Sequence, residues 1–232
     1  MSVKDNILGI NNEISSLCLR INRDLESIKL IAVTKEVGPA EILLAIESGI
    51  TDIGENKVQE ALNKYNILNT QYSMLNTLKW HMIGHLQTNK AKDAVKIFDL
   101  IHSVDSLRLA DEINKQAEKI DKIQDILIEV NTSGEKTKFG LTADEAVEVV
   151  KKAAELKSIR IQGLMTIAPL SDNPESSRPY FRILRELRGK LNELRATNYE
   201  LRILSMGMSQ DYKIAIEEGA TMIRVGRVIF KQ

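Results

Sequence analysis

Hydrophobic residues follow two different periods along this chain. From residue 30 onward, short apolar runs of five or six residues alternate with longer stretches in which apolar residues recur every three or four positions. The short runs are typical of buried strands, and the longer stretches are typical of amphipathic helices. Eight runs are predicted to be strands: LIAVTK (30–35), TDIGEN (51–56), WHMIGH (80–85), LIHSV (100–104), ILIEVN (126–131), GLMTI (163–167), LRILSM (201–206) and MIRVG (222–226).

The alternation of eight strands with helices predicts the fold class α/β, as a single (β/α)8 barrel of the TIM type. Helix boundaries agree, because Pro39 suits a first helical position, and Thr142 and Glu145 form a capping box. Gly49 and Gly219 stand where helices should end. Periodicity leaves an open, doubly wound sheet as the alternative.

A further helix is predicted before the first strand. Apolar residues are spaced by three and four positions through this segment, which makes one stripe of an amphipathic helix. The stripe consists of Ile7, Ile10, Ile14, Leu17, Ile21, Leu25 and Ile28.

Composition narrows the class of protein. With 232 residues and no Pro- or Gly-rich linker, the chain is expected to form one domain, 1–232. The 32 basic and 32 acidic residues leave no net charge, so neither nucleic acid nor an anionic membrane is an expected partner. The N-terminus lacks the pattern of a signal peptide, and the single cysteine, Cys18, has no internal disulfide partner. A cytoplasmic location is therefore expected, with Cys18 as a packing residue.

Lys35 is the strongest candidate for chemistry. It ends the first predicted strand and shares strand parity with Ile31 and Val33, so it should leave an apolar run and be partly desolvated. Desolvation favours the neutral amine, which attacks aldehydes to form a Schiff base. The alternative is a lysine at a strand end whose ammonium reaches solvent.

The last two strands carry features of an anion site. In SMGMSQD (205–211), Gly207 permits close backbone approach and Ser209 is expected to cap the next helix. The eighth strand ends in Arg224, Val225, Gly226 and Arg227, and a glycine there leaves room for an anion to contact backbone N–H groups. Because the two strands are neighbours in a barrel, they could hold one phosphate together.

Other polar residues at strand ends are candidates for lining the same cleft. Asn56 follows the second strand, and His81 and His85 bracket the third strand end. The two histidines straddle a strand end and a glycine instead of sharing a helix face, so no metal site is predicted. His102 lies within a strand and is expected to be a satisfied core or rim residue.

Seven motifs in order identify a resemblance. The chain resembles the YggS/PROSC family of pyridoxal phosphate homeostasis proteins, whose fold is similar to the N-terminal barrel of bacterial alanine racemase with an added N-terminal helix. The motifs are AVTK (32–35), GENKVQE (54–60), WHMIGHLQTNK (80–90), KFG (138–140), GLMTI (163–167), LSMGMSQDY (204–212) and IRVG (223–226).

The resemblance implies a site for pyridoxal 5′-phosphate. It makes Lys35 the Schiff-base lysine, sets Arg224 against the pyridine nitrogen and places Met206 under the ring. Asn56 and His85 fall in motifs that line the pocket. The phosphate is expected near Ser205, Ser209, Gly226 and the amide of Arg227. Arg227 departs from the family, because relatives usually carry a small hydroxyl residue there.

The resemblance also implies a role as a carrier or buffer of the cofactor, without strong catalysis of its own. The expected partners are pyridoxal phosphate and apo forms of pyridoxal phosphate-dependent enzymes, and the protein is expected to be a monomer. An amino-acid racemase-like enzyme is the alternative, and a protein-interaction module is a third possibility. A guanidinium at the pyridine nitrogen, such as that of Arg224, disfavours ring protonation and makes the cofactor a poorer electron sink.

Overall fold

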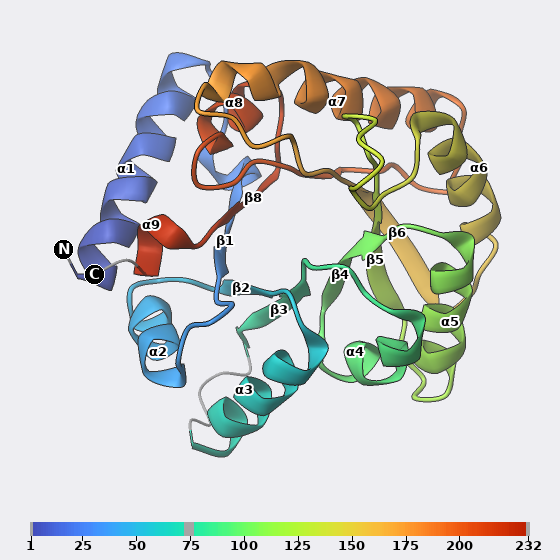
Figure 1. Ribbon diagram of the computed structural model, residues 1–232, viewed down its shortest axis with the longest axis horizontal. Coiled ribbons are helices and arrows are strands. Elements are labelled where there is room, and N and C mark those ends of the chain that lie inside the picture. Colours follow the sequence, from blue (N-terminus) through green and yellow to red (C-terminus); the bar gives the residue numbers. More distant parts are fainter. Residues whose placement is uncertain (1, 72–76, 231–232) are drawn as a thin grey trace.

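The computed structural model describes residues 2–71 and 77–230, so Met1, residues 72–76 and the last two residues of the expected domain lie outside the described residues. Its strands close into a parallel barrel in the order β1 to β8, with helices around the outside (Figure 1). The prediction of a closed (β/α)8 barrel is confirmed, and the open sheet is wrong.

The strands are β1 (Lys29–Val33), β2 (Asp52–Glu55), β3 (Lys79–Met82), β4 (Leu100–Val104), β5 (Gln124–Glu129), β6 (Ile159–Met165), β7 (Ile203–Ser205) and β8 (Met222–Val225). The α-helices are α1 (Val3–Arg20), α2 (Pro39–Glu47), α3 (Val58–Gln71), α4 (Ala91–Ile97), α5 (Leu107–Glu118), α6 (Ala143–Ala153), α7 (Arg178–Glu193), α8 (Tyr212–Glu217) and α9 (Arg227–Phe230). Short 3-10 helices are η1 (Leu25–Ser27), η3 (Thr88–Lys90) and η4 (Pro174–Ser177).

The added N-terminal helix is present but shorter than predicted. A capping box between Ser2 and Asp5 starts α1, and its buried face includes Ile7 and Cys18. The helix ends at Arg20, and Asn22 then adopts a positive φ of 53°. The last part of the predicted stripe, at Leu25 and Ile28, was therefore wrongly assigned to this helix. Cys18 is buried, as expected for a packing residue.

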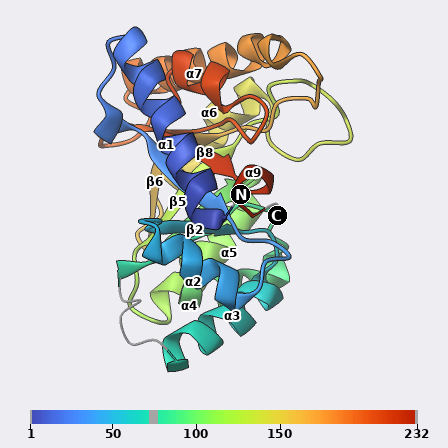
Figure 2. The same cartoon turned by 90° about the vertical axis from the view of Figure 1, so that its left-hand side faces the viewer.

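Helix α1 lies against the outside of the barrel and contacts α2 and α9 (Figure 2). The side-chain amide of Asn6 donates a hydrogen bond to the carbonyl of Ile229 at 3.0 Å. Arg20 pairs with Glu217 at 2.8 Å. The first helix of the chain therefore packs against the last βα unit.

The barrel interior holds both apolar and polar side chains. A small apolar cluster fills part of it, made of Ile31, Leu100, Leu127, Met165 and Met222. The much larger core lies between the strands and the surrounding helices. Inward-facing polar residues share the barrel interior with the apolar cluster, and they are described with the site below.

Predicted helix boundaries agree well with the structure. Pro39 is the first residue of α2, and the capping box of Thr142 and Glu145 starts α6. Gly49 and Gly219 have φ values of 95° and 97° just after α2 and α8, where only glycine is unstrained. Among the described residues, no helix combines the length and the apolar character needed to cross a bilayer.

Candidate functional site

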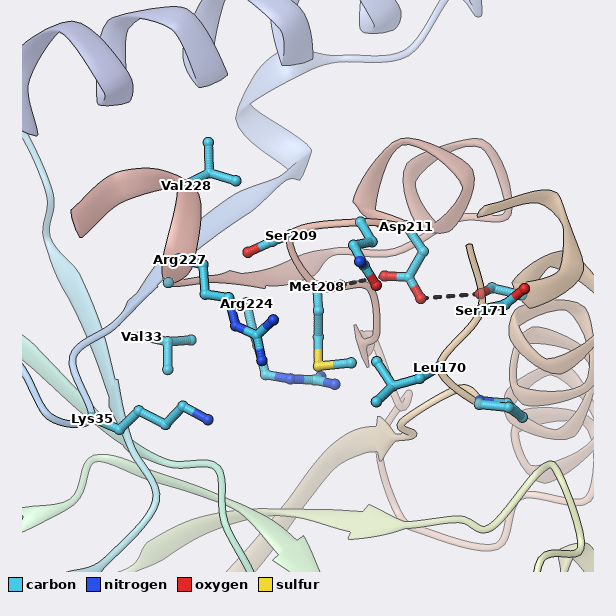
Figure 3. A pocket seen from close by; sticks show the side chains of 14 residues that line it. Val33, Lys35, Leu170, Ser171, Met208, Ser209, Asp211, Arg224, Arg227 and Val228 are labelled. Atoms are coloured by element: carbon cyan, nitrogen blue, oxygen red, sulfur yellow. Dashed lines mark hydrogen bonds between the residues drawn. The ribbon is translucent and has the colours of Figure 1, made fainter. Parts of the chain in front are cut away.

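A cavity of about 340 Å³ opens where β1, β7 and β8 end (Figure 3). This is the carboxyl end of the barrel strands, where βα loops gather in this fold. Five of the predicted site residues line it: Lys35, Ser209, Arg224, Gly226 and Arg227. The other lining residues are Val33, Pro169, Leu170, Ser171, Ser177, Met208, Gln210, Asp211 and Val228.

Lys35 lies in the turn after β1, two residues beyond the strand end. The parity argument holds, since Ile31 belongs to the inner cluster while Val33 and Lys35 line the cavity. Its side chain extends into the cavity toward Arg224 (Figure 3). The expected desolvation is wrong for this structure, because Lys35 is exposed: the strand stops before it and the cavity is open to solvent.

The backbone that leads into Lys35 is held by a buried ion pair. The Lys64 ammonium donates to the Thr34 carbonyl at 2.7 Å and to a carboxylate oxygen of Glu55 at 2.8 Å. The Thr34 hydroxyl donates to the same Glu55 oxygen at 2.5 Å. Glu55 is fully buried, so this clamp fixes the peptide between Thr34 and Lys35. Sequence reasoning missed it, because it picked Asn56 instead of Glu55 from GENKVQE.

Arg224 is the innermost charged group of the cavity. It is buried, and its guanidinium donates to the Ser205 hydroxyl at 2.6 Å and to the Thr166 carbonyl at 2.8 Å. Burial lowers the pKa of Arg224 to about 10, and the charges of Asp211 and Glu129 partly oppose this. At neutral pH it remains a cation, which disfavours a second positive charge beside it.

Two loops present backbone N–H groups to the cavity. Within the described residues, no protein acceptor takes the N–H groups of Ser209, Gln210, Gly226 and Arg227. Gly226 allows a close approach of the backbone to β1, since a Cβ would lie in tight contact, 3.0 Å from the Val33 carbonyl oxygen. Convergent free N–H groups of this kind form a site for an oxyanion such as a phosphate.

Asp211, and not Ser209, starts the helix after β7. Asp211 is the N-cap of α8, and its carboxylate accepts hydrogen bonds from the Met208 amide at 2.6 Å and the Ser177 hydroxyl at 3.1 Å. The predicted cap role of Ser209 is therefore wrong. Because the Asp211 carboxylate holds this loop through these hydrogen bonds, the Ser209 hydroxyl and N–H have no partner among the described residues and can bind a ligand.

Ser205 and Met206 lie away from the cavity lining. Ser205 is the last residue of β7 and points into the barrel, where its hydroxyl meets Arg224 and His102. Met206 is fully buried in the outer core, on the opposite face of the chain. The prediction that Met206 lies under the ring is wrong for this structure, because adjacent residues of an extended chain face opposite ways. Met208 lines the cavity instead.

Asn56 and His85 do not reach this cavity either. His85 pairs with Asp105 at 3.1 Å and stacks on Phe139, with ring centroids 3.7 Å apart. Asn56 packs against Gly84, where a Cβ would lie 2.4 Å from the Asn56 carbonyl oxygen. Asn56 follows β2 and His85 lies in the loop after β3, on a different side of the barrel mouth from β7 and β8.

The cavity also has a wall that sequence reasoning did not find. Leu170 and Ser171, from the loop after β6, lie on the opposite side of Arg224 from Lys35 (Figure 3). Pro169, from the same loop, also lines the cavity. Leu170 is 83% exposed. No periodic pattern marks such a loop, so only the fold reveals that it belongs to the site.

His81 and His102 meet in the barrel interior, 2.9 Å apart between ring nitrogens. His102 is fully buried with all its polar atoms bonded, as expected for a core residue. In the part of the chain that the structure describes, no three His, Cys, Asp or Glu side chains are arranged to hold a metal ion.

Comparison with known proteins identifies the family. Residues 14–232 match the family model described as the alanine racemase N-terminal domain. The pyridoxal phosphate homeostasis protein of Aquifex aeolicus is 44% identical over 230 residues, which cover 99% of this chain and 98% of that protein. The chain belongs to the family of pyridoxal phosphate homeostasis proteins. The resemblance to the YggS/PROSC family seen in the seven motifs is thereby confirmed.

Solved structures of relatives agree with this family assignment. PipY from Synechococcus elongatus PCC7942, solved with PLP bound, is 33% identical, with a TM-score of 0.84 over 99% of this chain and 100% of that one. Alanine racemase from Clostridium difficile 630 is 17% identical, with a TM-score of 0.75, over 100% of this chain and 56% of that one. The racemase likeness concerns the fold only, and it confirms the expected racemase-like barrel.

Proposed function

We propose that this member of the family binds pyridoxal 5′-phosphate and carries or buffers it. The observation that supports the proposal is the meeting, in one cavity, of a primary amine on Lys35, a cation on Arg224 and four free backbone N–H groups. This set matches the aldehyde, the ring nitrogen and the phosphate of the cofactor.

Each part of the cavity has a role in this proposal. The Lys35 amine condenses with the aldehyde as a Schiff base, with loss of one water molecule. Arg224 stands at the ring nitrogen and keeps it unprotonated, since two adjacent positive charges repel. Ser209, Gly226 and Arg227 hold the phosphate through charge-assisted hydrogen bonds from N–H and hydroxyl groups.

Not all the predicted residues keep a direct role. Ser205 acts through Arg224, because its hydroxyl is bonded to the guanidinium. Asn56 and His85 lie on the β2 and β3 side of the mouth, so we propose that they shape the rim. The side chain of Arg227 is exposed and supplies positive charge near the phosphate.

A carrier fits this cavity better than a racemase. Racemisation needs a base on each face of the substrate carbon and exclusion of water. Among the described residues that line the cavity, Lys35 is an amine base, and neither tyrosine nor histidine is present opposite it. The exposed position of Lys35 also leaves the covalent link open to hydrolysis or to attack by an incoming amine, which suits release more than turnover.

A protein that releases its cofactor needs recipients for it, which bears on its expected location and partners. We propose a cytoplasmic monomer that hands pyridoxal phosphate to apo-enzymes which depend on it. Absence of catalysis belongs to the same proposal, since a carrier needs a bound aldehyde that can be released again unchanged.

A spectrum of the purified protein tests the proposal. Protein loaded with pyridoxal phosphate should be yellow, and borohydride should bleach the visible band and fix one cofactor mass on the peptide that contains Lys35. Colourless protein that shows no spectral change on titration with the cofactor would overturn both the carrier and the racemase hypotheses.

A further inference from the structure

A chain of buried polar side chains crosses the barrel interior and ends at Arg224. The Arg224 guanidinium is 2.6 Å from the Ser205 hydroxyl, which is 2.9 Å from Nδ1 of His102. Nε2 of His102 is 2.9 Å from Nδ1 of His81, and Nε2 of His81 is 2.8 Å from a carboxylate oxygen of Asp52. All five residues are at most 3% exposed.

The strand register explains how this series of hydrogen-bonded side chains runs along the barrel axis. His81 pairs with Gly54, two residues beyond Asp52 on β2. His102 lies two residues beyond Leu100, the partner of His81. On the far wall, Arg224 lies two residues beyond Met222, the partner of Ser205. The polar chain therefore starts at the amino end of β2 and finishes at the carboxyl end of β8.

The lower end of the chain is a carboxylate held by further donors. Asp52 accepts hydrogen bonds from the Thr51 hydroxyl at 2.7 Å and from the Lys29 ammonium at 3.3 Å. Burial by itself raises the pKa of Asp52, but the hydrogen bonds from His81 and Thr51 outweigh it and lower the pKa below its ordinary value. Lys29 is about half exposed, so only this end of the chain reaches the solvent at the amino end of the barrel.

Donor and acceptor capacities allow one complete assignment. Arg224 can only donate, so the Ser205 oxygen accepts from it, and the Ser205 hydrogen is left for Nδ1 of His102. His102 then carries its proton on Nε2 and donates to His81, which carries its own on Nε2 and donates to Asp52. Every hydrogen is used. In the reverse direction, the Ser205 hydrogen has no acceptor, and a buried unpaired hydroxyl is costly.

His102 is suited to this neutral role. Burial, reinforced by the positive charge of Arg224, lowers its pKa well below the ordinary value. Among the described residues, no carboxylate lies within hydrogen-bonding distance of Arg224, and its acceptors are the Ser205 hydroxyl and the Thr166 carbonyl. The charges of Asp211 and Glu129 stabilise the guanidinium at longer range. The polarised hydrogen bonds that end on the Asp52 carboxylate add to this stabilisation.

We infer that Ser205, His102, His81 and Asp52 form a one-way hydrogen-bond relay that holds the Arg224 guanidinium in the cavity. These are positioning residues, since none of them lines the cavity itself. The effect on the cofactor rests on the proposed function, whereas the existence of the relay does not.

Histidine NMR of the cofactor-free protein tests the relay first. The chain has three histidines, so ¹⁵N-labelled histidine gives a simple spectrum. His81 and His102 should each donate from Nε2, with Nδ1 of His102 unprotonated, and Ser205→Ala should shift the Nδ1 resonance of His102. Ser103→Ala is the matched control, because Ser103 is equally buried beside His102 and its hydroxyl has no partner. A proton on Nδ1 of His102 in the wild type, or equal spectra for Ser205→Ala and Ser103→Ala, would overturn the relay.

Release of the cofactor tests the positioning role. Ser205→Ala should speed the release of both pyridoxal phosphate and pyridoxal by about tenfold, since a hydrogen bond to a charged group is lost. If Ser205→Ala speeds the release of pyridoxal phosphate but not of pyridoxal, Ser205 is a phosphate contact, and the inference is contradicted. Asp52→Asn, far from the cavity, should speed release by about threefold, because a charged acceptor becomes neutral; a rate equal to wild type would remove Asp52 from the relay. If the wild type binds no cofactor, the proposed function fails, while the NMR result still decides the relay.

Discussion

Lys64 donates a hydrogen bond to the carbonyl oxygen of Thr34 at 2.7 Å, so an ammonium from α3 holds the peptide bond that leads into Lys35. The same ammonium neutralises Glu55, which is fully buried. Loss of Lys64 would leave a buried carboxylate without a countercharge. The structural support of the reactive lysine thus depends on a residue from a neighbouring helix.

We predict that Lys64→Met destabilises the protein by about 3 kcal/mol, because breaking a buried ion pair on one side costs more than the pair contributes. Urea denaturation measures the change. Lys57→Met is the matched control on an exposed pair with Glu60, and it should lower the stability far less than Lys64→Met. The double variant Glu55→Gln, Lys64→Met should recover part of the loss. Equal effects of Lys57→Met and Lys64→Met would contradict the clamp.

Lys35→Arg should abolish the covalent link to the cofactor while leaving weaker, non-covalent binding. A guanidinium keeps the positive charge but does not condense with an aldehyde at neutral pH. Mass spectrometry after borohydride reduction checks this, with Lys57→Arg as a lysine control outside the cavity. Full adduct formation on another lysine in the Lys35→Arg variant would show that Lys35 is misassigned.

Pyridoxal 5′-phosphate should bind about 100-fold more tightly than pyridoxal, because two charge-assisted hydrogen bonds to the phosphate contribute about 3 kcal/mol. Spectral titration with both compounds gives the ratio, and inorganic phosphate should compete with the phosphorylated form. Equal affinities would move the phosphate away from Ser209, Gly226 and Arg227.

The stability of the protein should fall between pH 5 and pH 8 because of Glu129. Burial, reinforced by the charge of Asp105 and opposed by Arg224, raises the pKa of Glu129 to about 7. The folded state therefore holds this proton more tightly than the unfolded state, whose pKa is near 4.5. Its contribution is fully present below about pH 4.5 and is lost as the pH rises through 7.

Glu129→Gln removes this dependence. Relative to the variant, the wild type should lose about 3 kcal/mol between pH 5 and pH 8, as measured by urea denaturation at several pH values. Glu148→Gln, on an exposed residue of α6, serves as the control and should differ from wild type by a constant amount. A constant difference for Glu129→Gln as well would show that Glu129 is ionised throughout this range.

Protein loaded with cofactor should not racemise L-alanine at many turnovers per second. The cavity offers the Lys35 amine on one side and no second amine, phenol or imidazole among its described lining residues. Chiral analysis of the incubated amino acid provides the measurement, and Lys35→Ala controls for contaminating racemase. Rapid, Lys35-dependent formation of D-alanine would favour the enzyme hypothesis.

The barrel and the place of Lys35 could be predicted because both depend on local periodicity. Alternation along β1 puts Ile31 inside and brings Val33 and Lys35 to the cavity. The same rule, applied to Ser205 and Met206, would have shown that two adjacent residues cannot both face the cofactor. The desolvation of Lys35 could not be predicted correctly, because solvent access depends on loops without a periodic pattern.

The clamp and the relay lie beyond what local patterns show. Each joins residues from different strands or helices, such as His102 and Ser205, which are 103 positions apart in the chain. A partial signal existed, since Asp52, His81 and His102 are polar residues within apolar strands. Only closure of the barrel shows that their side chains meet.

The packing of α1 against α9 has a consequence for biosynthesis. Asn6 and Ile229, which join the two helices, are separated by 223 positions in the chain. On a ribosome, α1 emerges before any strand, yet part of its apolar face finds its partner only after β8 has been made. Contacts of such long range form late and slowly, so nascent chains should keep α1 accessible to chaperones until synthesis of the last helix.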